Sequence, residues 1–358
     1  MKQHHTTLPN GCTYYFVDEP PVSGEAPKAT LFCFHGFPDQ WYGWKHQIVA
    51  WSNAGYRVIV PHMLGYGSTD KPSDPSAYST KNLTNDLALL LDALQLPQVV
   101  VIGHDWGAAV AWRFALWHPD RLTHLITMSV PYFPPSKSYI PPSEASKRVP
   151  TFAYQEYFAN TASTREVESN LDTFLLAVFQ SPDAANFTPS QPVSSNEQNS
   201  AGGFGASIPF VLKGQMQALL TGDKSKIKHH PTVVSNDELE RYHEDFSKGG
   251  MNGPLSYYRN TRSRFDDERV AGSTLGIRPN LPVLFMFGTK DSTCPKGFVD
   301  RMSAFVRDLK VVTLEDVGHW VLIEAKERTT EEVLNFLEER KDHVGLLPHS
   351  RRLLESKL

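Results

Sequence analysis

Short apolar runs alternate with amphipathic stretches over the first third of the chain. Between the runs, apolar residues recur at helical spacing over Thr80–Leu94, and Gly107–Trp117 has the composition of a buried helix. The alternation predicts a mostly parallel, doubly wound α/β sheet. Ala29–His35 is a short apolar run that stops at Gly36, as a buried strand should, and Arg57–Pro61 repeats this pattern. Further strands are expected over Gln98–Ile102 and Leu122–Val130.

The alternation stops in the middle of the chain. Residues 131–280 are rich in proline and aromatic residues and contain several helical stretches but few strand-like runs. Within them, Ser181–Gly205 is rich in Ser, Asn, Pro and Gly and predicts a long loop. We therefore expect one α/β core, residues 1–130 and 281–358, with a mainly helical cap inserted over residues 131–280.

Turn and cap residues mark further predicted elements. Asn10-Gly11 predicts a hairpin turn before a strand that begins at Thr13. After the insertion, strands are predicted over Leu281–Phe287 and Lys310–Leu314, with a helix over Lys296–Arg307 between them. Thr329-Thr330-Glu331-Glu332 has the pattern of a capping box and predicts the start of the last helix.

Composition and charge narrow the classes of partner. The 358 residues include 35 basic and 39 acidic side chains, which gives a net charge of −4 without a clustered basic patch. We therefore expect no nucleic acid partner and no attraction to an anionic membrane surface. No apolar run is long enough to predict a membrane span. The three cysteines, Cys12, Cys33 and Cys294, lack a CxxC spacing and favour a reducing compartment.

The last three residues are Ser356-Lys357-Leu358, the tripeptide that a peroxisomal import receptor recognises. The amino-terminal residues show no apolar stretch behind their charge, so a secretory signal peptide is not expected. These features predict a peroxisomal or cytoplasmic location, or both. The sequence allows a homodimer as well as a monomer.

The most informative motif is Gly103-His104-Asp105-Trp106-Gly107, where a predicted strand passes into a predicted helix. Small residues two before and two after the centre permit a tight strand-to-helix turn that exposes the central side chain, the nucleophile elbow. An ionised carboxylate at this position, unlike a serine, can displace a leaving group at an sp³ carbon. The resulting ester must be hydrolysed, so the site also needs a base for water and donors for an oxyanion.

Candidates for these further groups follow other predicted strands. His319, in Gly318-His319-Trp320, is the predicted base, and Asp291 is the acid expected to orient its imidazole. Asp316 is the rival acid, although it lies too near His319 along the chain to face the ring easily. The backbone N–H groups of Phe37 and Trp106 are the candidate oxyanion donors, although a plain turn at Gly36-Phe37-Pro38 explains the first motif equally well.

With these motifs together, the chain resembles the epoxide hydrolase family of the α/β-hydrolase fold, and most of all the catalytic domain of the soluble enzymes. The order nucleophile, acid, base is that of the fold. The resemblance covers nearly the whole chain and rests on these segments: His35–Trp41, Gly65-Tyr66-Gly67, His104–Gly107, Asp291, Gly318–Trp320, Phe152–Phe158 and Asn252–Asn260.

The resemblance implies hydrolysis of a hydrophobic epoxide to a vicinal diol, without metal or other cofactor. It implies that Tyr154 and Tyr258 donate hydrogen bonds to the epoxide oxygen from the cap, which no other signal separates from simple packing. It further implies that four residues contact the substrate: His35, Phe37, Pro38 and Trp106. The chain departs from the family pattern at Ser181–Gly205 and His229–Glu238, where the cap is longer and more polar.

Two alternatives remain open from the sequence. A haloalkane dehalogenase also has an Asp elbow followed by Trp, but many such enzymes carry an Asn after the His-Gly pair, where this chain has Phe37. A non-catalytic ligand-binding protein could also use the same fold. The presence of Asp105, Asp291 and His319 together argues against the second alternative.

Overall fold

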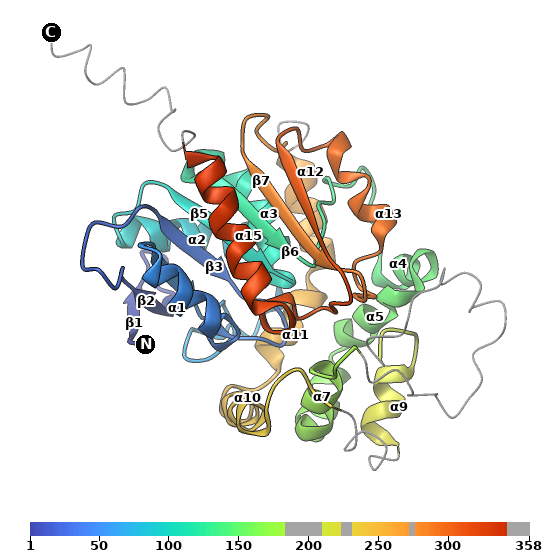
Figure 1. Ribbon diagram of the computed structural model, residues 1–358. Coiled ribbons are helices and arrows are strands. Elements are labelled where there is room, and N and C mark those ends of the chain that lie inside the picture. The colour runs from blue at the N-terminus through green and yellow to red at the C-terminus, as the bar shows by residue number, and fades with distance from the viewer. Residues whose placement is uncertain (183–209, 223–230, 272–275, 342–358) are drawn as a thin grey trace, which may run out of the picture.

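The computed structural model describes residues 1–182, 210–222, 231–271 and 276–341. Within these residues the strands form one sheet in the order β1-β2-β4-β3-β5-β6-β7-β8 (Figure 1). β2 pairs antiparallel with both β1 and β4, and the other pairs are parallel, as the sequence predicts. The strands are β1 (Gln3–Thr7), β2 (Thr13–Glu19), β3 (Thr30–Phe34), β4 (Arg57–Pro61), β5 (Val99–His104), β6 (Leu122–Met128), β7 (Val283–Gly288) and β8 (Leu309–Leu314).

Helices cover both faces of the sheet, which is why the central strands are apolar throughout. In β5, Val99 and Val101 belong to one hydrophobic cluster, whereas Val100 and Ile102 belong to the other. The first cluster includes buried residues of α2 (Thr80–Ala93) and α3 (Trp106–Trp117). The second includes those of α1 (Lys45–Asn53), α14 (Val321–Glu324) and α15 (Lys326–Glu339). Because the helices cover the two faces of the sheet, the edge at which the parallel strands end remains available for a site.

The chain between β6 and β7 is helical, and its described residues form no strand beyond an isolated bridge between Gln180 and Thr232. Figure 1 shows α7, α9 and α10 together to one side of the sheet. The predicted loop over Ser181–Gly205 lies almost entirely outside the described residues. The helices are α4 (Pro142–Arg148), α5 (Ala153–Ala159), α6 (Ala162–Glu168), α7 (Leu171–Val178), α9 (Gln215–Thr221), α10 (Asn236–Gly249), α11 (Asn252–Arg259) and α12 (Thr261–Ala271).

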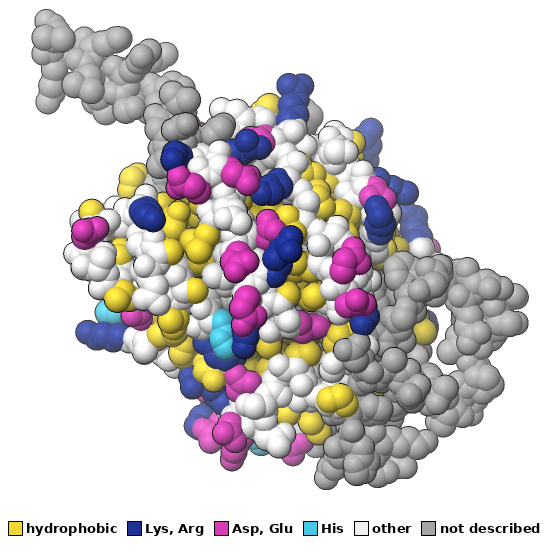
Figure 2. All heavy atoms as spheres, in the orientation of Figure 1, with side chains coloured by type: hydrophobic (Ala, Val, Ile, Leu, Met, Phe, Trp, Pro, Cys, Tyr) yellow, Lys and Arg dark blue, Asp and Glu magenta, His cyan; other side chains and the backbone are white. Residues whose placement is uncertain are grey.

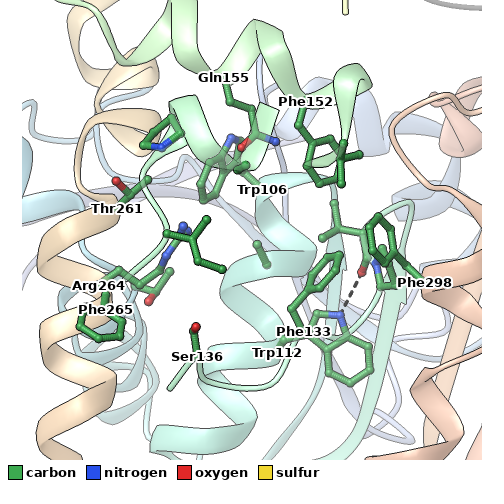
Figure 3. A pocket seen from close by; sticks show the side chains of 18 of the residues that line it. Trp106, Trp112, Phe133, Ser136, Phe152, Gln155, Thr261, Arg264, Phe265 and Phe298 are labelled. Atoms are coloured by element: carbon green, nitrogen blue, oxygen red, sulfur yellow. Dashed lines mark hydrogen bonds between the residues drawn. The ribbon is translucent and has the colours of Figure 1, made fainter. Parts of the chain in front are cut away.

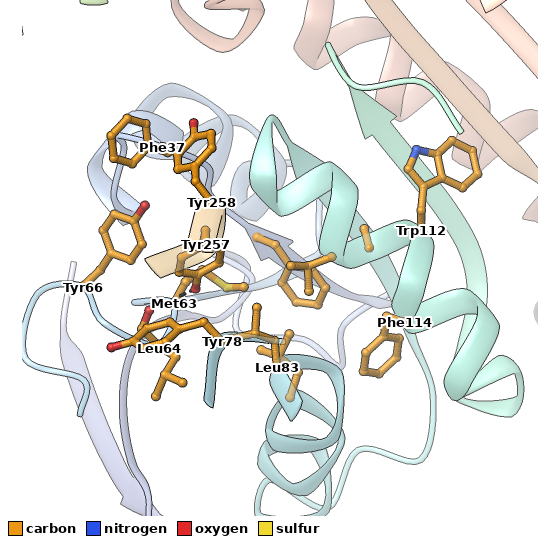
Figure 4. Packing of buried hydrophobic residues seen from close by; sticks show 14 of the residues in the cluster. Phe37, Met63, Leu64, Tyr66, Tyr78, Leu83, Trp112, Phe114, Tyr257 and Tyr258 are labelled. Carbon is orange, nitrogen blue, oxygen red and sulfur yellow. Dashed lines mark hydrogen bonds between the residues drawn. The ribbon is translucent and has the colours of Figure 1, made fainter. Parts of the chain in front are cut away.

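The helix α11 packs directly on the Gly65-Tyr66-Gly67 segment that follows β4. Gly65 has φ +88°, and a Cβ there would meet the backbone of Gly253 at 3.0 Å. The close approach lets the Tyr257 hydroxyl donate to the Leu64 carbonyl at 3.0 Å. Figure 4 shows Tyr257 among Met63, Leu64 and Tyr78, with Tyr258 turned toward Phe37. The turn therefore holds the insertion against the core beside the predicted oxyanion segment.

Two details of the predicted elements are wrong. The helix predicted over Lys296–Arg307 is α13 (Lys296–Val299) followed by a 3₁₀ turn at Met302–Ala304. In that stretch amides bond to carbonyls three residues back, as from Phe305 to Met302, which winds the segment more tightly than an α-helix. The predicted capping box does not start the last helix, because α15 already begins at Lys326. Thr329 is buried and donates its hydroxyl to the Val321 carbonyl at 3.0 Å, so it anchors α15 to α14 and caps nothing.

No helix in the described ranges is long and apolar enough to cross a membrane. The predicted peroxisomal tripeptide, Ser356-Lys357-Leu358, lies outside the described residues, so that location stays a prediction.

Candidate active site

The elbow around Asp105 has the strained geometry that its glycines predict. Asp105 stands between β5 and α3 with φ +53° and ψ −122°, a backbone conformation that is costly for a residue with a Cβ. A Cβ at Gly107 would overlap the Phe34 carbonyl oxygen, and one at Gly103 would overlap the Gly107 carbonyl oxygen. The turn therefore requires both glycines, and it directs the Asp105 carboxylate out over the strand ends.

The structure brings the predicted acid and base to this carboxylate. His319 follows β8, and Asp291 follows β7, so two neighbouring strands place them side by side. His319 Nδ1 lies 2.9 Å from Asp291 Oδ2, and His319 Nε2 lies 3.5 Å from Asp105 Oδ2. All three side chains are buried. The rival Asp316 is 86% exposed at its side chain and pairs with Lys290, so it does not face the ring.

Thr293 belongs to this arrangement and was not predicted. Its backbone N–H and its hydroxyl both lie within hydrogen-bond distance of Asp291 Oδ1, at 2.8 and 2.6 Å. The hydroxyl oxygen also lies 3.2 Å from His319 Nδ1. An aspartate whose side chain accepts from the residue two positions on forms a common turn, so Asp291-Ser292-Thr293 carried a signal for this contact.

The backbone at His319 is held by polar groups that the sequence does not reveal. Its carbonyl accepts a hydrogen bond from the Ser129 hydroxyl at 3.0 Å and one from His104 Nε2 at 2.8 Å. Because a carbonyl only accepts, His104 must carry its proton on Nε2. The Glu324 carboxylate accepts from the N–H groups of Gly318 and Trp320, at 2.8 and 2.9 Å. These hydrogen bonds thus fix the backbone immediately before, at and after His319.

Two carboxylates next to one imidazole set the protonation state of the site. Burial alone would lower the pKa of His319, but the negative charges of Asp291 and Asp105 and their hydrogen bonds raise it well above its ordinary value. Burial would likewise raise the pKa of Asp105, but the hydrogen bond and charge of His319 hold it below its ordinary value. Both shifts therefore favour the same charged pair, an imidazolium at His319 beside an ionised Asp105.

The candidate oxyanion donors flank the same carboxylate. The Phe37 N–H donates to Asp105 Oδ1 at 2.7 Å, so the turn at this motif directs a backbone donor at the carboxylate. The Phe37–Pro38 peptide bond is cis. Trp106 is the first residue of α3, and its N–H is one of the first-turn amides that no carbonyl of the helix can accept. The Phe37 N–H therefore contacts the carboxylate of Asp105, and the Trp106 N–H belongs to the residue that follows Asp105 in the chain.

His35 does not reach the site, contrary to the substrate contact expected for it. It is 1% exposed, its Nδ1 lies 3.0 Å from the Gly36 carbonyl, and its Nε2 accepts from the Met63 N–H at 3.0 Å. Both ring nitrogens are thus engaged by the backbone behind the elbow. Burial lowers the pKa of His35 to about 3, so the ring is neutral and joins β3 to the segment after β4.

Tyr154 on α5 and Tyr258 on α11 come together on the side of the site that the insertion provides. Their ring centroids lie 6.1 Å apart, and Tyr258 packs edge-on against Trp106 at 5.1 Å. Burial raises the pKa of both phenols, and the charge of Asp105 raises each further. Both tyrosines are therefore neutral donors close enough to Asp105 to feel its charge.

Two cavities meet at Asp105, Tyr154 and Thr293. The smaller, of about 30 Å³, is also lined by His319, Phe37, Pro38 and Tyr258, and it has room for water. The larger, of about 420 Å³, extends between α3, α5 and α12 (Figure 3). Its walls are mainly apolar and include Trp106, Trp112, Phe133, Phe152, Phe265 and Phe298. Its lining also includes polar and charged residues for which the sequence predicted no role, among them Gln155, Arg113, Arg264 and Glu268.

The carboxylate pair predicts a measurable shift in the titration of His319. Replacing Asp105 by Asn removes one of the two negative charges, so the pKa of His319 should fall from its raised value. Asp316→Asn is the matched control and should leave the titration unchanged, because Asp316 is exposed and paired with Lys290. NMR of ¹⁵N-labelled histidine over a pH series checks this. An unchanged His319 titration in Asp105→Asn would show that the two side chains do not interact.

The chain matches the model of the alpha/beta hydrolase fold family over residues 29–326. It is 30% identical to epoxide hydrolase B of Mycobacterium tuberculosis, over 94% of this chain and 99% of that one. It is 29% identical to the bifunctional epoxide hydrolase 2 of Rattus norvegicus, over 93% of this chain, and spans about half of that relative, 55% of its length.

Solved structures that resemble this chain are also epoxide hydrolases. The crystal structure of epoxide hydrolase A from Mycobacterium thermoresistibile matches with a TM-score of 0.72 and 27% identity, over 94% of this chain and 98% of that one. Potato epoxide hydrolase I matches with a TM-score of 0.73 and 25% identity, over 94% of this chain and all of that one. This chain therefore belongs to the epoxide hydrolase family of the α/β-hydrolase fold.

Proposed function

We propose that the protein hydrolyses an epoxide to a vicinal diol through a covalent ester on Asp105. The observation that carries the proposal is the placement of two neutral phenols, Tyr154 and Tyr258, near a carboxylate that is already ionised. A carboxylate can attack the ring carbon directly, whereas the ring oxygen must gain a proton to leave easily. The site offers both groups, with residues 131–280 acting as a cap that supplies the acid.

In the first half-reaction, Asp105 Oδ2 forms a bond to a ring carbon while the bond from that carbon to the epoxide oxygen breaks. The oxygen takes a proton from Tyr154 or Tyr258. The phenolate regains a proton from the His319 imidazolium, by way of solvent. This last transfer is favourable, because the new ester is neutral and one of the two charges that raised the pKa of His319 has gone.

In the second half-reaction, the now neutral His319 takes a proton from water, and hydroxide attacks the carbonyl carbon of the ester. The small cavity beside His319 has room for that water. The Phe37 and Trp106 N–H groups stabilise the tetrahedral oxyanion. Collapse breaks the bond between this carbon and the alkyl oxygen, the diol leaves with the acid proton, and Asp105 and imidazolium are restored. Asp291 keeps the imidazole in place throughout.

A haloalkane dehalogenase remains the second candidate, since a halide would also leave from carbon attacked by Asp105. A halide needs N–H donors and no proton, so the two phenols would have no role. The residue after Gly36 is Phe37, whose side chain offers no donor, and its ring packs on Tyr258 at 5.2 Å. The phenols therefore favour the epoxide.

Replacing His319 should separate the two half-reactions. His319→Gln keeps the nucleophile and both phenols but removes the base, so alkylation should proceed and hydrolysis should stall. Intact-protein mass spectrometry after mixing with styrene oxide should show one added substrate mass, located at Asp105 by peptide mapping. Asp105→Ala is the control and should show no adduct. Turnover at the wild-type rate by His319→Gln would contradict the covalent route.

The tyrosines distinguish the epoxide from the halide. Tyr154→Phe and Tyr258→Phe should each slow alkylation by about tenfold to a hundredfold, the lower range for one general acid. The double variant should lose far more, because no acid would remain near the ring oxygen. Stopped-flow fluorescence with styrene oxide measures alkylation, and halide release from 1-chlorohexane is the parallel assay. Near wild-type epoxide turnover by the double variant, or rapid halide release by the wild type, would overturn the assignment.

A further inference from the structure

The hydroxyl of Thr293 touches both the acid and the base of the site. Thr293 Oγ1 lies 2.6 Å from Asp291 Oδ1 and 3.2 Å from His319 Nδ1. The residue also lines both cavities, together with Asp105 and Tyr154. The two half-reactions described above give this hydroxyl no role, although it lies closer to the imidazole than any other uncharged side chain oxygen that bonds to it within the described residues.

The hydroxyl has one proton, and the surrounding atoms determine where it goes. The 2.6 Å separation from a carboxylate oxygen is typical of a charge-assisted O–H···O bond. His319 Nδ1 carries a hydrogen of its own, because it faces Asp291 Oδ2 at 2.9 Å and an ionised carboxylate can only accept. The Thr293 hydroxyl therefore donates to Asp291, and its lone pairs offer the Nδ1–H of His319 a second acceptor.

The same residue fixes the rotation of the Asp291 carboxylate. Oδ1 accepts from both the backbone N–H and the hydroxyl of Thr293, at 2.8 and 2.6 Å. These two donors occupy Oδ1, which leaves Oδ2 to face the imidazole. Thr293 thus connects the acid to the base through its own hydroxyl and also holds the acid in the rotation that the base requires.

We propose that Thr293 is a positioning residue for the second half-reaction, where it keeps the neutral imidazole of His319 turned with Nε2 toward the ester. The inference rests on the proposed function. Before alkylation, Asp105 and Asp291 attract the imidazolium from opposite sides and orient it together. Ester formation removes the charge of Asp105, and the ring is then held from the Nδ1 side, by Asp291 and Thr293. Loss of the hydroxyl should therefore slow hydrolysis of the ester but spare its formation.

Thr293→Val tests the proposal, because it removes the hydroxyl and keeps the shape of the side chain. Single turnovers with styrene oxide, stopped by rapid quenching and analysed by intact-protein mass spectrometry, measure how fast the ester on Asp105 forms and decays. Ester formation should remain close to the wild-type rate. Ester decay should slow by about tenfold to a hundredfold, the effect of one hydrogen bond to a charged group, so the ester should accumulate during turnover.

Matched variants separate positioning from a general loss of structure. Ser292→Ala removes the neighbouring hydroxyl, which is buried and has no hydrogen-bond partner among the described residues, and should leave both steps unchanged. Thr293→Ser keeps the hydroxyl and should retain most of the rate of ester decay, whereas Thr293→Ala should lose it. This second pair decides the matter even if Thr293→Val does not fold. Equal losses in both steps, or equal decay rates in Thr293→Ser and Thr293→Ala, would overturn the proposal.

Two further measurements keep this inference distinct from the proposed function. His319→Gln should trap the ester, so a trapped ester there with normal decay in Thr293→Val would overturn the role of Thr293 alone. No ester in either variant would contradict the covalent route instead. NMR then still tests the contact, in Asp105→Asn, whose neutral side chain has the charge of the ester. There the Nδ1 proton of His319 should exchange faster with water when Thr293→Val is added, and an unchanged exchange rate would show that the hydroxyl does not hold the ring.

Discussion

The charge of one imidazole between two carboxylates governs this site. Asp291 lies 2.9 Å from one ring nitrogen of His319, and Asp105 lies 3.5 Å from the other, all three within the protein. The arrangement is favourable only while the ring is protonated, because two buried carboxylates without a cation would be strongly destabilised. Much of the surrounding structure holds this line of charges: the strained elbow, the turn at Asp291-Ser292-Thr293, and the hydrogen bonds of Glu324 to the His319 loop.

The same three charges make an order of events possible. An ionised Asp105 is ready to attack, while a protonated His319 cannot yet act as a base. Conversion of Asp105 into a neutral ester would remove one charge and release His319 for the second step, so the nucleophile itself would control the base. The core supplies this machinery. In the proposed reaction, the helices between β6 and β7 contribute the two phenols near Asp105.

The residues that follow strands in the core could be predicted from the sequence, because parallel strands bring their carboxyl ends to one edge. Asp105, Asp291 and His319 meet as this rule requires. The two tyrosines could be predicted only from the family resemblance. The packing of the helices between β6 and β7 depends on the fit of their side chains, and no short sequence pattern encodes that fit. His35 and Thr329 were misassigned for the same reason: a polar motif residue turned inward to satisfy a backbone group.

The route of oxygen tests the central claim most directly. A single turnover in H₂¹⁸O, with enzyme in excess over styrene oxide, should yield diol without label, because its new oxygen comes from Asp105. The label should appear in the Asp105 side chain, where mass spectrometry of the peptide that contains it would show a gain of one ¹⁸O. Labelled diol and an unlabelled Asp105 after the first turnover would mean that water attacks the epoxide directly, and would contradict the covalent account.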